Sequence, residues 1–170
     1  MALRFISVLA ALVLLAACET SPEGAGGAGG AGGAGGAGNS SSGLPSPRMG
    51  SAEDFVVNVG DRVFFGFDKY TLKPQARKTL QRQAAWLKKF PALTIAIEGH
   101  CDERGTREYN LALAERRANS AKNYLVALGV NPNRVKVISY GKERPAVAGA
   151  NEAAWSQNRR SVTVVNAAGS

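Results

Sequence analysis

Cysteine and histidine are scarce in this chain of 170 residues, which has only Cys18, Cys101 and a single histidine, His100. Two cysteines cannot form the dense disulfide network that holds many small secreted domains together. One histidine leaves no second imidazole to serve as a catalytic base. We therefore expect a fold that depends on its hydrophobic core, with no metal site and no cofactor.

Long apolar runs are absent after residue 17. Before that point Arg4 precedes an apolar run, Phe5 to Ala17, that ends in small side chains, which is typical of a secretory signal. The run is shorter than the span of about 20 residues that a membrane helix needs. The sequence predicts that residues 1–17 are a signal peptide and that the rest is exported.

Cys18 follows directly after the run Leu15-Ala16-Ala17, and this pattern resembles the lipobox of bacterial lipoproteins. The resemblance implies cleavage before Cys18 and lipidation of its thiol, with attached chains that hold the protein at a membrane. Glu19 is not the aspartate associated with inner-membrane retention, which favours the periplasmic face of the outer membrane. The alternative is an unmodified cysteine after an ordinary cleavage site. Lipidation would leave Cys101 without an intramolecular disulfide partner.

Large apolar side chains are also rare between residues 19 and 52, where a glycine-alanine repeat runs from Gly24 to Gly38. Such a segment cannot bury enough surface to offset the entropy of ordering its backbone. We interpret residues 18–52 as the lipidated N-terminus and a flexible linker. A collagen helix would need proline and many more triplets.

A single domain, residues 53–170, is predicted from the composition beyond the linker, and its length suits one core. Apolar periodicity, Pro74, Pro91 and Gly129 predict helices over 74–90 and 106–128, with Thr106 as the cap of the second. Strands are predicted at 62–67, 94–98, 135–140 and 160–165, with a short helix at 151–157. Strands that alternate with helices favour βαβ units, so we expect an α/β sandwich with helices packed on a small mixed sheet.

One polar stripe lies beside the apolar stripe of the second long helix. Asn110, Leu113 and Arg117 are spaced i, i+3 and i+7, so they share a face that we expect to be a half-exposed ledge. Asp102 lies in the preceding loop and can fold back toward Arg117. A carboxylate and a guanidinium across a small gap suit a zwitterionic ligand.

The run GHCDERGTREYN from Gly99 to Asn110, followed by Leu113, Arg116, Arg117 and Ala118, resembles the OmpA-like peptidoglycan-binding domain. Supporting stretches are FGFD at 65–68, SYGKERP at 139–145 and NRR at 158–160. The resemblance covers about residues 60–165. Together with the lipobox and the linker, the domain makes the whole chain resemble one subgroup of this family more closely, namely the lipoproteins that act with the Tol proteins.

This resemblance implies that the domain binds the diaminopimelate of the peptidoglycan stem peptide without covalent attachment. Asp102 would take its ammonium and Arg117 its carboxylate, and the other expected site residues are Asn110, Thr106, Phe67, Asp68 and Arg159. Phe67 could equally be a core residue of its strand, and the sequence leaves open which of Arg159 and Arg160 faces the ligand.

The same resemblance implies a place in the cell envelope. The chain would link the outer membrane to the wall and support envelope integrity and cell division. TolB is the implied periplasmic partner, and TolA is a further candidate.

Three other functions fit parts of the sequence less well. His100, Cys101 and Asp102 are the residue types of a hydrolase, but adjacent side chains point apart, so we expect no enzyme. The net charge of +8 suits anionic surfaces, including nucleic acid, but no nucleic-acid motif is present and export removes such partners. A flagellar stator subunit would need a membrane helix.

Overall fold

The computed structural model describes residues 46–166. The predicted signal peptide, Cys18 and most of the predicted linker lie outside the described residues. None of the helices within 46–166 combines the length and the apolar character that a membrane span requires.

Four strands form one mixed sheet in the order β1-β4-β2-β3. They are β1 (Arg62–Phe64), β2 (Thr94–Gly99), β3 (Val135–Ser139) and β4 (Arg160–Asn166). Strand β3 is parallel to β2, whereas β4 is antiparallel to both β1 and β2. Strands β1 and β2 therefore run in the same direction with β4 inserted between them, as in a split βαβ unit.

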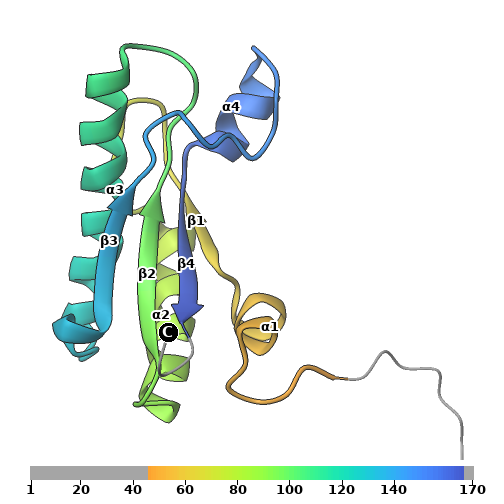
Figure 1. Ribbon diagram of the computed structural model, residues 1–170, viewed down its shortest axis with the longest axis vertical. Coiled ribbons are helices and arrows are strands. Elements are labelled where there is room, and N and C mark those ends of the chain that lie inside the picture. Colours follow the sequence, from red (N-terminus) through yellow and green to blue (C-terminus); the bar gives the residue numbers. More distant parts are fainter. Residues whose placement is uncertain (1–45, 167–170) are drawn as a thin grey trace, which may run out of the picture. The chain divides into compact units, whose positions relative to one another are not determined.

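Two long helices cover one face of the sheet, as Figure 1 shows: α2 (Pro74–Lys89) and α3 (Arg107–Ala127). Leu80 and Leu87 of α2, Leu125 of α3, and Ile95 and Ile97 of β2 are wholly buried between these layers. Each such side chain contributes roughly 1.5–3 kcal/mol by leaving water. The predicted α/β sandwich with helices on a mixed sheet is confirmed.

The helix ends follow the capping signals in the sequence. The Thr106 hydroxyl accepts from the Tyr109 amide at the start of α3, and Gly129 takes a positive φ of 91° just beyond its end. The short helix α4 (Glu152–Asn158) begins after Asn151, whose side chain accepts from Ala154. These ends lie within two residues of the predicted ones.

The structure adds a helical segment that the sequence analysis did not predict. Helix α1 (Ala52–Asp54) runs directly into a π-helical turn, η1 (Phe55–Val59). Asp54 accepts a hydrogen bond from the Trp86 indole at 2.8 Å, and the Phe55 ring packs edge-on against Trp86 at 4.9 Å. A further 3-10 turn, η2 (Pro132–Arg134), precedes β3.

Candidate functional site

A pocket of about 260 Å³ opens at the end of the sheet where β2 ends and α3 begins. The β1–α2 loop, the β2–α3 loop and the first turns of α3 form its walls. Five of the seven predicted site residues line it: Phe67, Asp68, Asp102, Asn110 and Arg117.

Arg117 is the largest fully buried side chain near the pocket, with 1% of its surface exposed. Its guanidinium donates to three backbone carbonyls, those of Lys69 at 2.8 Å, His100 at 2.9 Å and Gly66 at 3.1 Å. It also donates to the Cys101 sulfur at 3.2 Å. Arg117 therefore ties both pocket loops to α3.

The polar stripe on α3 is not the half-exposed ledge that its spacing suggested. Asn110 is 2% exposed and Leu113 is 5% exposed, because the two loops fold over the start of the helix. The Asn110 amide donates to the carbonyls of Arg104 at 2.8 Å and Thr106 at 3.0 Å, which holds the β2–α3 loop in place.

The charge on Arg117 has no carboxylate partner within residues 46–166, where every salt bridge involves other groups. Burial lowers the pKa of Arg117, yet a guanidinium stays protonated at neutral pH. A buried cation that borders a pocket is strongly stabilised by an anion placed there.

Asp102 is buried too, but it pairs with arginines other than the expected Arg117. Its carboxylate contacts Arg104 at 2.6 Å and Arg159 at 3.3 Å. Burial alone would raise the pKa of Asp102, and the hydrogen bonds from Arg104 outweigh it and hold that pKa below its usual value. The carboxylate is therefore ionised at neutral pH.

The two adjacent arginines at the start of β4 point in different directions. Arg159 turns toward the site, where it bridges Asp102 and Glu152 and donates to the Phe65 carbonyl at 3.3 Å. Arg160 points to the opposite side and donates to the Arg144 carbonyl at 3.2 Å. Arg159 supports Asp102 from behind and does not line the pocket.

Phe67 and Asp68 form the rim of the pocket. The prediction of strand up to Phe67 was wrong, because β1 ends at Phe64 and the chain then turns, with Asp68 at a φ of +54°. Phe67 is 60% exposed, so it is not a core residue. Asp68 accepts from the Tyr109 hydroxyl, which raises the pKa of Tyr109.

Thr106 lies beside the site and has a structural role. It caps α3 and is exposed, and it does not line the pocket. Lys142 holds the same loop from outside by donating to the carbonyls of Glu103 at 3.2 Å and Gly105 at 2.7 Å.

The residues near the site that were not predicted as site residues include Arg104, Tyr109, Glu152 and Trp155. The Arg104 guanidinium stacks between the rings of Phe67 at 4.1 Å and Trp155 at 4.0 Å. Arg104 and Tyr109 lie within the run that carries the family resemblance, so their position could have been used to predict that they are near the site. Glu152 and Trp155 lie on α4, and nothing in their spacing indicated that α4 approaches the β2–α3 loop.

The adjacent His100, Cys101 and Asp102 do not form a catalytic arrangement. Burial raises the pKa of the Cys101 thiol to about 11, so no thiolate forms near neutral pH. The His100 ring stacks on Tyr140 at 5.4 Å, and its two nitrogens have no hydrogen-bond partner among residues 46–166. Within the same residues no cluster of three or more His, Cys, Asp or Glu side chains could hold a metal ion.

His100 should make stability depend on pH. Burial, with Arg160 nearby, lowers its pKa to about 4, whereas in the unfolded chain it is about 6.5. Between these values the unfolded state binds more protons, so stability is lost as the pH falls below 6.5. We expect a loss of about 2 kcal/mol between pH 6.5 and pH 5, measured by urea unfolding. His100→Phe keeps an aromatic side chain without the titrating nitrogens and should remove most of the slope between pH 6.5 and pH 5, since the chain has no other histidine. Equal slopes for both proteins would refute the assignment.

Comparison with known proteins gives consistent relatives. A sequence model described as the OmpA family matches residues 64–159. The chain is 54% identical over 120 residues to a peptidoglycan-associated lipoprotein of Brucella melitensis, which covers 71% of each chain. It is 44% identical over 130 residues to the peptidoglycan-associated lipoprotein of Haemophilus influenzae, covering 72% of this chain and 85% of that one.

Solved structures agree with these relatives. The peptidoglycan-associated lipoprotein of Burkholderia pseudomallei matches with a TM-score of 0.61 and 43% identity, over 62% of this chain and 90% of that one. The C-terminal domain of Helicobacter pylori MotB matches with a TM-score of 0.59 over 63% of this chain and 84% of that one. Its identity of 23% shows a common fold and nothing further.

Proposed function

This chain belongs to the OmpA family and, within it, to the peptidoglycan-associated lipoproteins, and from this membership we propose that it binds the wall through the diaminopimelate of the peptidoglycan stem peptide. Its family role is structural and not catalytic, which confirms the prediction that the chain is not an enzyme. It is a lipoprotein of the cell envelope.

The observation that carries the proposal is the buried Arg117 guanidinium without a carboxylate partner in the described part of the chain. The side-chain end of diaminopimelate carries an ammonium and a carboxylate, and the carboxylate would supply the missing anion. Of the five N–H groups of Arg117, the contacts to Lys69, His100, Cys101 and Gly66 use four. One N–H on Nη2 remains, so the ligand's carboxylate would accept one charged hydrogen bond from Arg117.

The ammonium of the ligand would lie on the acidic side of the pocket. Asp102 remains the proposed acceptor, with Asn110 holding its loop and Arg159 supporting it from behind. Asp68 accepts only from Tyr109 among the described side chains, so it has acceptor capacity for the same ammonium. Phe67 would cover the ligand's methylene chain, and Thr106 would act through the loop.

The type of peptidoglycan provides the test. Lysine in place of diaminopimelate lacks the carboxylate and leaves Arg117 without an anion. We expect the purified protein to sediment with diaminopimelate-type peptidoglycan about tenfold to a hundredfold more strongly than with lysine-type peptidoglycan. Equal sedimentation with both walls would count against the proposed ligand.

The anchor and the partners are also proposals. The pattern before Cys18 supports a signal peptide at 1–17, lipidation of Cys18, a linker at 18–52 and attachment to the outer membrane, which density-gradient separation of membranes tests. The family resemblance supports TolB, and further TolA, as partners, with the chain linking the outer membrane to the wall during growth and division. Co-purification of TolB with the chain is the corresponding test.

A further inference from the structure

Asp102 has no free acceptor position in this structure. A carboxylate has about four lone-pair sites. Arg104 fills three of them, through its backbone N–H and Nε to Oδ1, both at 3.2 Å, and through Nη2 to Oδ2 at 2.6 Å. Arg159 fills the fourth at 3.3 Å. An ammonium can therefore reach Asp102 only if one of these donors leaves.

The donor that can leave is the Arg104 side chain. Arg159 is 7% exposed at its side chain and is fixed by Glu152 and the Phe65 carbonyl as well. The Arg104 side chain is 32% exposed, and within residues 46–166 its guanidinium has, apart from Asp102, interactions with the faces of two aromatic rings, Phe67 and Trp155. Phe67 is itself at the pocket rim, where it can move without disturbing the core.

We propose that Arg104 is an internal competitor for the binding site, whose guanidinium occupies the position of the ligand's ammonium at Asp102 and must swing out before the ligand binds. The inference rests on the proposed function, since it takes diaminopimelate as the ligand. In the empty site, the contact with Arg104 keeps the Asp102 carboxylate ionised, and the positive charge of the guanidinium balances its negative charge. A cation without the accompanying carboxylate would gain too little to displace it, so the contact also favours zwitterions over simple amines.

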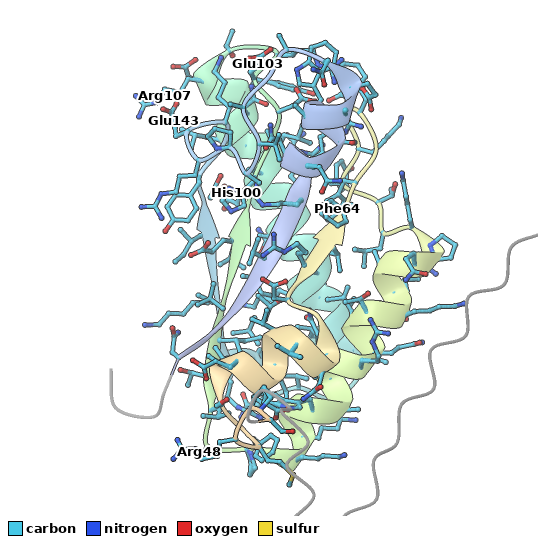
Figure 2. The ribbon with its side chains drawn as sticks, turned by 90° about the vertical axis from the view of Figure 1, so that its right-hand side faces the viewer. Arg48, Phe64, His100, Glu103, Arg107 and Glu143 are labelled. Carbon is cyan, nitrogen blue, oxygen red and sulfur yellow. The ribbon has the colours of Figure 1, made fainter. Side chains whose placement is uncertain are left out.

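Removing the competitor should tighten binding. In the full-length protein, purified in detergent, Arg104→Gln keeps the hydrogen bond from the backbone amide of residue 104 to Asp102 and loses the two charged hydrogen bonds from the guanidinium. We expect it to bind a soluble diaminopimelate tripeptide about threefold to tenfold more tightly than wild type by calorimetry. Arg107→Gln is the matched control: Arg107 is exposed, pairs with Glu143 at 3.2 Å, and lies at the same end of the molecule as Glu103 (Figure 2). It removes the same charge and should leave binding unchanged.

Trp155 provides a second readout of the movement. The chain has two tryptophans, and Trp86 is buried in the core, so a ligand-dependent change in fluorescence reports on Trp155. We expect the tripeptide to change the emission of wild type, and much less that of Arg104→Gln. If neither protein binds the tripeptide, the proposed function fails and this inference fails with it. If both bind, and Arg104→Gln binds no more tightly than Arg107→Gln, the inference alone is overturned.

Discussion

Replacing Arg117 with alanine should abolish wall binding and lower the free energy of unfolding by about 3 kcal/mol or more. The binding loss follows because the pocket loses its buried cation. The stability loss follows because the carbonyls of Lys69 and His100 lose the Arg117 donor, at a partly buried and a buried contact, and the Gly66 carbonyl keeps only its bond from the Lys69 amide. These carbonyls belong to the β1–α2 and β2–α3 loops, which Arg117 joins to each other and to α3.

Two companion variants separate ligand binding from folding. Arg116→Ala removes an exposed arginine next in sequence and should leave both wall sedimentation and urea unfolding unchanged. Arg117→Lys keeps the charge, but one ammonium cannot replace a planar fork that reaches three carbonyls. We expect it to remain folded with weak binding. Sedimentation of folded Arg117→Ala with the wall at the level of Arg116→Ala would contradict the proposed site.

Gly99→Ala should remove most of the stability of the domain, by about 4 kcal/mol or more. A Cβ atom at Gly99 would lie 1.9 Å from the carbonyl oxygen of Ala114 and 2.6 Å from its carbonyl carbon. Both belong to the backbone of α3, which cannot rotate aside as a side chain can. Strand β2 and helix α3 would have to separate next to the loop that carries Asp102 and to the helix turn that carries Arg117.

Thermal unfolding of Gly99→Ala checks this expectation, with Gly66→Ala as the control. A Cβ atom at Gly66 would be 3.4 Å from the nearest atom, a flexible part of the Lys69 side chain. That substitution should change the melting temperature little. Similar melting temperatures for the two variants would show that α3 can shift away from β2 at little cost, contrary to the close packing of these two elements.

Periodicity and capping predicted the long elements well for physical reasons. Helix α2 lies between Pro74 and Pro91, and α3 between Thr106 and Gly129, so backbone chemistry fixes their ends locally. The segment 52–59 was missed because its helical turns depend on a distant partner, the indole of Trp86, which no local pattern reveals. The early end of β1 was missed for a similar reason, since the turn at Asp68 is supported from α3.

The site was predicted as a set of residues and less well as a set of interactions. Spacing placed Asn110 and Arg117 on one face of α3, and the structure brings both to the pocket. The partner of Asp102 could not be predicted, because a choice between Arg104, Arg117 and Arg159 depends on how the loop folds. Which arginine pairs with Asp102 depends on distances between side chains in the folded protein, and sequence spacing does not give those distances.

The last residues of the linker and the pocket lie at opposite ends of the domain, and this placement determines how the domain would respond to a pulling force. Arg48 lies at one end of the domain and Glu103, beside the pocket, at the other, as Figure 2 shows. If the wall holds the pocket and the membrane pulls through the linker, tension runs along β1 and its neighbour β4. Antiparallel hydrogen bonds are perpendicular to their strands, so this tension shears several of them together instead of opening them one by one. The domain would then resist stretching of the envelope through a slow rate of unfolding, beyond its equilibrium stability.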